Sequence, residues 1–141
     1  RRQRQMCIRD SPCPDAPLQH GNQRAWLLHR LAGDGAGGFF GIYFTDIPLS
    51  DAESGRLGDL VTAQPDVKTL VIARRGCPET AFGPPPRAEV WQDCEGFFEA
   101  RYGAAPGSFY LVRPDQHVAD CWPVLDCAAV ARARARTLAL E

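Results

Sequence analysis

Two apolar runs separated by a helix-like segment constrain the fold of this chain more than any other feature. The first run, GFFGIYFTD, covers Gly38–Asp46, and the second, VKTLVIAR, covers Val67–Arg74. Both are rich in aromatic or β-branched residues, which favours buried strands. The segment between them opens with Ser50 and Glu53, the pair of a helix capping box. The pattern predicts a strand–helix–strand unit over residues 38–74.

Further elements flank this unit on both sides. Prolines and glycines make Arg75–Ala88 a loop, and Asp93 is placed to cap the next helix, with Gly103 as its stop. An Ala-rich segment follows Asp126, a second capping residue. The predicted elements are, in order, a helix over 23–33, a strand over 38–46, a helix over 50–63, strands over 67–74 and 89–93, a helix over 94–103, hairpin strands Phe109–Val112 and His117–Trp122 around the turn Arg113–Gln116, and a helix over 127–141.

This order, α-β-α-β-loop-β-α-β-β-α, matches the thioredoxin-like arrangement. That is an α/β fold with a mixed sheet, helices on both faces, and a C-terminal β-hairpin plus helix. We therefore assign residues 23–141 to one thioredoxin-like domain. Residues 11–22 hold three prolines and a glycine, and we expect them to form a linker from a missing upstream domain, without regular structure. Residues 1–10 resemble translated sequencing-adapter read-through; the only methionine, Met6, lies there, so we expect a piece of a longer protein.

Composition narrows the class of protein. A chain of 141 residues is long enough for one domain with a core, and 45% hydrophobic with 23% charged residues is typical of a soluble globular protein. The formal net charge of -1 gives no reason to expect nucleic acid as a partner. No apolar run approaches the roughly 18 residues that span a bilayer, and no export signal is present. We therefore expect a cytoplasmic protein with no membrane partner.

The stretch GDGAGG, Gly33–Gly38, matches the G-x-G-x-x-G template of dinucleotide-binding proteins. Such a loop must leave a strand and enter a helix, because the pyrophosphate binds at the helix N-terminus. Here the loop leaves a predicted helix and enters a predicted strand. We interpret it as a turn rather than a cofactor site.

Six cysteines occur, at positions 7, 13, 77, 94, 121 and 127, with no C-x-x-C pair. We expect reduced thiols, several of them buried. In thioredoxin-like enzymes the reactive thiol follows the first sheet strand, at a helix N-terminus. The corresponding stretch here, FTDIPLSDAE, has no cysteine, and Gly107 stands where a cis-proline is common, with Pro106 one residue early. An unusual pair such as Cys121 and Cys127 remains the alternative.

Other side chains with catalytic potential are better explained as structural. The histidines are far apart in sequence, the serine lacks a nucleophile-elbow context, the carboxylates fall at a helix start, and the arginines alternate along one helix. These residues are His20, His29 and His117; Ser108; Asp93, Glu95 and Glu99; and Arg132, Arg134 and Arg136. We predict no catalytic, cofactor-binding or metal-ligating residue in this chain.

A longer stretch carries a resemblance to a known family. WQDCEGFFEARYGAAPGSFYLVRPDQHVADCW, Trp91–Trp122, resembles the C-terminal thioredoxin-like domain of FAD-dependent aromatic-ring hydroxylases of the phenol hydroxylase and 3-(3-hydroxyphenyl)propionate hydroxylase type. The matching pieces are Asp93–Gly96, the pair Tyr102 and Gly103, and the block YLVRPDQHVA. SPCPDAPL and WLLHRLAG are similar as well, so the resemblance extends from Ser11 to the end of the chain.

The resemblance implies a parent enzyme that uses NAD(P)H and FAD to hydroxylate an aromatic ring. The parent's flavin and substrate motifs lie in a preceding domain, so none of its site residues maps onto this chain. The implied role is a non-catalytic domain that packs on the flavin and substrate domains and, in some members, contributes dimer contacts. A piece of a longer protein should also expose an apolar face that its parent covers. The alternatives are a stand-alone thioredoxin-like redox protein or a protein-interaction module.

Overall fold

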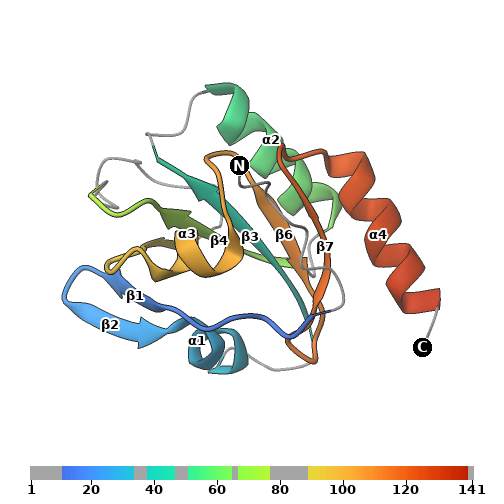
Figure 1. The fold of residues 1–141 in the computed structure, drawn as a ribbon. Coiled ribbons are helices and arrows are strands. Elements are labelled where there is room, and N and C mark those ends of the chain that lie inside the picture. The colour runs from blue at the N-terminus through green and yellow to red at the C-terminus, as the bar shows by residue number, and fades with distance from the viewer. Residues whose placement is uncertain (1–10, 34–37, 47–50, 65–66, 77–88, 140–141) are drawn as a thin grey trace, which may run out of the picture.

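The computed structural model describes residues 11–33, 38–46, 51–64, 67–76 and 89–139. These residues form a seven-stranded mixed sheet in the order β2-β1-β5-β4-β3-β6-β7 (Figure 1). The predicted strand–helix–strand unit is confirmed, because β3 (Phe39–Thr45) and β4 (Val67–Ala73) pair in parallel and α2 (Asp51–Ala63) lies between them in sequence. β5 (Glu89–Gln92) adds a third parallel strand beside β4. The predicted α/β fold with a mixed sheet is confirmed.

The C-terminal hairpin is also confirmed. β6 (Phe109–Val112) pairs antiparallel with β3, and β7 (Val118–Trp122) pairs antiparallel with β6. β6 therefore lies between β3 and β7, and its four residues are all buried. The hairpin therefore extends the parallel centre of the sheet on the side of β3.

The N-terminal prediction is wrong in two places. β1 (Pro17–His20) lies in the segment predicted to lack regular structure, and it pairs antiparallel with β2 (Gln23–Trp26), which occupies the start of the predicted helix. Gly21 supplies the left-handed turn residue between them with φ 59°. The first helix accordingly begins at Leu27 rather than at residue 23, as α1 (Leu27–Gly33). Each strand is only four residues long, too short for a clear alternating pattern, and β1 is held by pairing with the distant β5.

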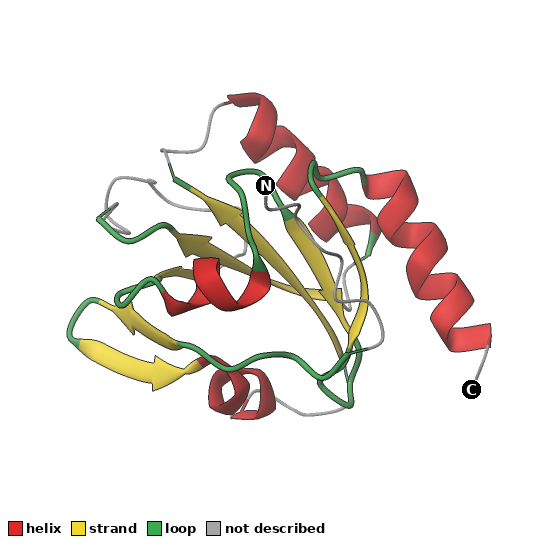
Figure 2. Cartoon of the chain, in the orientation of Figure 1, coloured by secondary structure: helices red, strands yellow, loops and turns green. Residues whose placement is uncertain are grey.

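Helices cover both faces of the sheet, as predicted (Figure 2). α1 and α3 (Phe97–Tyr102) pack on one face, where the side chains of Phe40, Ile42 and Phe44 point from β3. α2 and α4 (Cys127–Ala139) pack on the other face, against Phe39 and Tyr43 of the same strand. Alternate residues of one strand thus support two separate cores, which is why its seven residues are all buried.

The helix α3 is shorter than predicted. The sequence predicts it over 94–103, but it begins at Phe97 because Gly96 takes a left-handed conformation with φ 75°. Its stop at Gly103, with φ 61°, is confirmed. Phe98 and Tyr102 stack at 4.1 Å and are buried against the sheet, also as predicted.

Two further predictions concern residues outside the described part of the chain. The capping-box residue Ser50 and most of the loop over 75–88 lie outside them. Glu53, the other member of the capping box, accepts a hydrogen bond from the hydroxyl of Tyr43. This contact ties the first turn of α2 to the centre of β3.

Candidate functional site

In open sheets of this kind, ligands and reactive groups gather beyond the carboxyl ends of the parallel strands. Here β3, β4 and β5 run parallel, and the residues that follow them are Asp46, Arg74 and Asp93. This edge is also the place where thioredoxin-like proteins carry their chemistry.

One arginine dominates the edge. Arg74 donates from Nη1 to Oδ2 of Asp46 at 3.2 Å, and its Nε and Nη2 reach Oε1 and Oε2 of Glu99 at 3.1 and 2.8 Å. The fork-shaped contact with Glu99 is the stronger geometry for an arginine–carboxylate pair. The three side chains thus link the end of β3, the end of β4 and the helix α3. The guanidinium of Arg74 thus binds the carboxylates of both Asp46 and Glu99.

Asp93 serves as a helix cap, which confirms its predicted role. Its carboxylate accepts hydrogen bonds from the backbone N–H groups of Phe98 at 2.9 Å and Glu99 at 3.0 Å. Its side chain is fully buried, and this burial raises its pKa above the ordinary value against the opposing effect of the two N–H donors. Glu95, its neighbour in the predicted trio of helix-start acids, pairs instead with Arg24 at 2.9 Å. The trio forms no acid–base pair.

The segment before β6 corresponds in position to the segment where redox proteins of this fold commonly carry a cis-proline. The backbone N–H of Gly107 donates to the carbonyl of Phe44 at 2.7 Å, and Phe44 N–H donates to the carbonyl of Ser108 at 2.9 Å. Gly107 has φ 96°, and among the described residues no peptide bond is cis. Ser108 is buried, and its Oγ accepts a hydrogen bond from the N–H of Ala105. Ser108 therefore serves the turn and is held away from solvent.

The predicted helix-to-strand direction of the glycine-rich stretch is confirmed. Gly33 is the last residue of α1, and Phe39 is the first residue of β3. Residues 34–37 lie outside the described part of the chain. The order of elements is the reverse of a dinucleotide-binding unit.

The cysteines correct one expectation. Cys13, Cys94 and Cys127 are free thiols, whereas Cys121 is disulfide-bonded. The expected reduced state therefore does not hold for Cys121. The structure does not join Cys121 to Cys127, because Cys127 is a free thiol that donates to the backbone carbonyl of Arg56 at 3.2 Å.

The three histidines occupy separate settings. His20 on β1 lies beside Trp91, with ring centroids 5.3 Å apart and the rings tilted by 41°, and its Nδ1 is 2.7 Å from the carbonyl oxygen of Val90. His29 is exposed on α1, and His117 lies at the hairpin turn with Nδ1 3.1 Å from the carbonyl oxygen of Asp115. Among the residues that the structure describes, no three His, Cys, Asp or Glu side chains are grouped to hold a metal ion.

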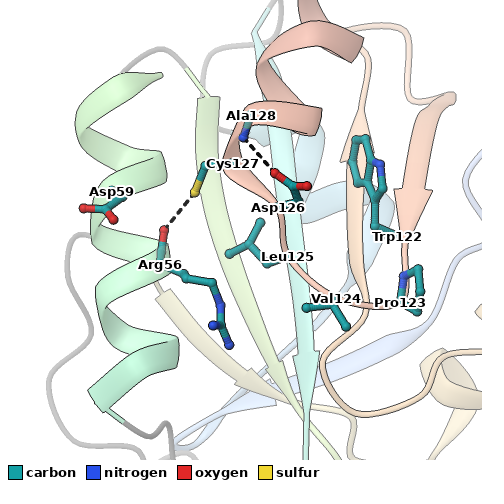
Figure 3. A pocket seen from close by; sticks show the side chains of 9 residues that line it. All are labelled: Arg56, Asp59, Trp122, Pro123, Val124, Leu125, Asp126, Cys127 and Ala128. Atoms are coloured by element: carbon teal, nitrogen blue, oxygen red, sulfur yellow. Dashed lines mark hydrogen bonds between the residues drawn. The ribbon is translucent and has the colours of Figure 1, made fainter.

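A groove of about 550 Å³ lies on the opposite face, between α2 and the start of α4 (Figure 3). Apolar side chains, including Trp122 and Val124, line one side, and Arg56 lines the other. Asp126 caps α4 through the N–H groups of Ala128 and Ala129, as predicted. Burial, followed by the nearby acids, raises the pKa of Cys127, so its thiol stays protonated near neutral pH and is a weak nucleophile. No local sequence pattern predicts this groove, because it forms only where α2 and α4 lie side by side.

No helix in the described ranges combines the length and the apolar character needed to cross a bilayer.

Comparison with known proteins supports the fold assignment. No protein-family model matches the chain, and no curated protein matches it either. Among solved structures, the chain is similar to the flavin-dependent monooxygenase PieE in complex with FAD and substrate, with a TM-score of 0.61 and 22% identity. That match covers 94% of this chain but only 20% of the monooxygenase.

Two smaller proteins are also similar. A secreted Mycobacterium tuberculosis disulfide oxidoreductase homologous to E. coli DsbE gives a TM-score of 0.53 at 20% identity, covering 70% of this chain and 82% of that one. A Xanthomonas campestris bacterioferritin comigratory protein gives 0.57 at 16% identity, covering 85% and 90%. At such identities the likeness shows a shared fold. The chain has a thioredoxin-like fold, and its structural neighbours include a disulfide oxidoreductase and part of a flavin-dependent monooxygenase.

Proposed function

We propose that this chain is the non-catalytic C-terminal domain of an FAD-dependent, NAD(P)H-using aromatic-ring hydroxylase. In this role it packs on the flavin and substrate domains of the longer polypeptide and contributes to a homodimer. The observation that carries the proposal is the match of 94% of this chain to one part of a flavin-dependent monooxygenase. It is joined by a strand-to-helix segment, residues 46–53, that holds no cysteine where redox relatives place their thiol.

The block YLVRPDQHVA supports a scaffold role, because its polar groups are engaged in local structure. Arg113 pairs with Asp115 at 2.6 Å across the turn, and the side chain of Gln116 donates to the carbonyl of Leu28 at 2.9 Å. The carbonyl of Gln116 accepts the N–H of Cys13 at 2.9 Å. The turn thus joins the hairpin to α1 and to the N-terminal segment. We interpret these contacts as stabilising the fold rather than as forming a ligand site.

The proposal is tested on the full-length product of the gene that encodes this chain. We expect it to purify with flavin absorbance near one FAD per chain and to oxidise NAD(P)H faster when a phenolic compound is added. Cys94→Ser and Cys127→Ser should leave this turnover unchanged, because neither thiol takes part. A full-length protein without bound FAD would overturn the proposal.

The 141-residue chain alone provides the complementary arm. We expect it to show no dithiothreitol-dependent reduction of insulin and no stoichiometric FAD binding. Insulin reduction abolished by Cys→Ser substitution at Cys94 would instead identify a redox protein. Tight FAD binding by the 141-residue chain alone would place the flavin site in this domain. It would overturn the proposal that another part of the polypeptide binds the flavin.

The proposal also places the protein in the cytoplasm, where NAD(P)H is available. Stable disulfides are rare in that compartment, and Cys121 is disulfide-bonded in the structure. Mass spectrometry after alkylation of intact cells tests this location, because cytoplasmic reductants should open the disulfide of Cys121 and leave it as a free thiol. A fully oxidised Cys121 would indicate an oxidising compartment.

A further inference from the structure

The segment that enters the domain is bound across the face of the sheet that α1 and α3 cover. Residues 11–16, which we call the strap, lead from the turn between β6 and β7 to the start of β1 (Figure 1). Cys13 and Ala16 of the strap are buried in the same core as Phe98 and Tyr102 of α3. The strap is therefore part of the packed domain, although its prolines are typical of a linker.

Two side chains of α3 hold the middle of the strap. The hydroxyl of Tyr102 donates to the carbonyl of Pro14 at 2.7 Å, and Nη1 of Arg101 donates to the carbonyl of Asp15 at 2.8 Å. Tyr102 is buried, so its hydroxyl needs a partner inside the protein, and the strap provides it. These contacts fix the strap to the last turn of α3.

The strap also supplies the acceptors at the start of α1. The first N–H groups of a helix have no acceptor within the helix itself. Here the N–H of Leu27 donates to the carbonyl of Ala16 at 2.8 Å, and the N–H of Leu28 donates to Oδ1 of Asp15 at 3.0 Å. The start of α1 therefore depends on the strap being bound.

Gln116, in the turn between β6 and β7, joins the strap to α1. Its carbonyl accepts the N–H of Cys13 at 2.9 Å, and its side-chain Nε2 donates to the carbonyl of Leu28 at 2.9 Å. Among the described residues it is the only one other than glycine with a positive φ, 64°. This backbone conformation is unfavourable for a residue with a Cβ atom, so glycine would suit the turn alone better. The side-chain contact with α1 gives a reason for glutamine at this position.

We propose that the strap fixes the preceding polypeptide to this domain at a rigid junction, with Gln116 as the residue that anchors it. The strap contacts α1, α3 and the β6–β7 turn, which makes these elements one body with the point of attachment. Pro12 and Pro14 restrict the unbound strap, so its binding costs less conformational entropy. That the attached polypeptide is the flavin- and substrate-binding part rests on the proposed function, whereas the anchoring of the strap rests on the contacts above.

The test is hydrogen exchange of backbone amides in the full-length protein, resolved residue by residue. The N–H groups of Cys13, Leu27 and Leu28 report on the strap, because their hydrogen bonds join it to the rest of the domain. The N–H of Phe44, which donates to the carbonyl of Ser108 at 2.9 Å, is the reference in the centre of the sheet. In the unaltered protein we expect all three strap amides to be strongly protected from exchange.

Substitutions at Gln116 then separate anchoring from general stability. Gln116→Ala should speed exchange at the three strap amides about fivefold relative to Phe44, the factor expected for one lost hydrogen bond. Gln116→Gly keeps the backbone conformation favourable but removes the side chain, so it should loosen the strap in the same selective way. Gln23→Ala is the matched control, because Gln23 is exposed on β2, and it should change none of these rates.

Each result has one meaning. Strap amides that exchange like an unstructured peptide in the unaltered protein would show a flexible linker and overturn the inference. Equal acceleration at the strap and at Phe44, or no effect of Gln116→Gly, would overturn the anchoring role of the Gln116 side chain. FAD content is measured on the same samples. A full-length protein without FAD but with a protected strap would defeat the proposed function and leave the anchored junction standing.

Discussion

Gly41 in the middle of β3 offers the sharpest test of how this strand packs against the side chain of Phe109. A Cβ atom added at this position would lie 2.5 Å from Cζ of Phe109, 3.1 Å from Cε1 and 3.5 Å from Cε2. Ordinary carbon contacts are about 3.5–4.0 Å, so the ring would have to move by about 1 Å. Phe109 is fully buried and lies beside Trp122, with ring centroids 6.2 Å apart. The ring therefore has little room to yield.

The expected cost of Gly41→Ala follows from two opposing effects. Overpacking a filled core costs about 1–3 kcal/mol. Replacing glycine restricts the unfolded chain, which offsets about 0.4–1 kcal/mol of that cost. The net loss in the free energy of unfolding should be about 0.5–2.5 kcal/mol. For a domain of this size that corresponds to a fall in Tm of about 2–10 °C.

Urea denaturation followed by tryptophan fluorescence measures this change, with an unaltered m-value as the sign that the fold is retained. Gly55→Ala is the matched control, because nothing lies within 4 Å of a Cβ atom there and the residue is in the helix α2. It should stabilise the protein by about 0.5–1 kcal/mol. Phe109→Leu should rescue part of the Gly41→Ala loss in a double-mutant cycle. A stabilising Gly41→Ala, or strict additivity with Phe109→Leu, would refute the reasoning.

Three further predictions concern buried polar groups. Burial raises the pKa of Asp93 in the folded state, so the folded protein binds an extra proton between the unfolded and folded pKa values and its stability falls as pH rises through that window. Asp93→Asn should flatten this part of the pH–stability profile measured by urea titration, and an unchanged profile would contradict it. Tyr43→Phe removes the hydrogen bond to Glu53 and should cost about 1 kcal/mol by thermal denaturation, with no loss refuting the contact's contribution. Burial raises the pKa of Cys13 to about 12, so a thiol reagent should modify the half-buried Cys94 long before Cys13, and equal rates would be inconsistent with the structure.

The sequence predicts the centre of the fold well and its margins poorly. The runs over 38–46 and 67–74 are long and apolar, so burial alone decides that they are strands. β1 and β2 are four residues each and largely polar, and β1 is held by a partner some seventy positions away, Gln92, which contacts Gln19. No local pattern carries such pairing information. The sequence pattern therefore predicts a linker at β1 and a helix at β2, where the structure has strands.

At the sheet edge, too, the sequence predicts the contacts between neighbours in the chain but not those between distant elements. The capping role of Asp93 follows from its position beside a predicted helix, and the structure confirms it. The ion pairs of Arg74 with Asp46 and Glu99 join three separate elements, so they become visible only when β3 and β4 lie side by side. Sequence reasoning can thus list the residue types at a sheet edge but cannot tell which of them neutralise one another.

The ion pairs of Arg74 with Asp46 and Glu99 bear directly on function. At a sheet edge that binds a ligand, some polar groups must stay unsatisfied by the protein so that the ligand can satisfy them. Arg74 is instead saturated by two carboxylates, and the carboxylate of Asp93 is buried under the helix it caps. Freeing Arg74 for a substrate would break contacts that hold α3 against the sheet. A domain built in this way gains rigidity at this edge of its sheet, which is consistent with the proposed scaffold role.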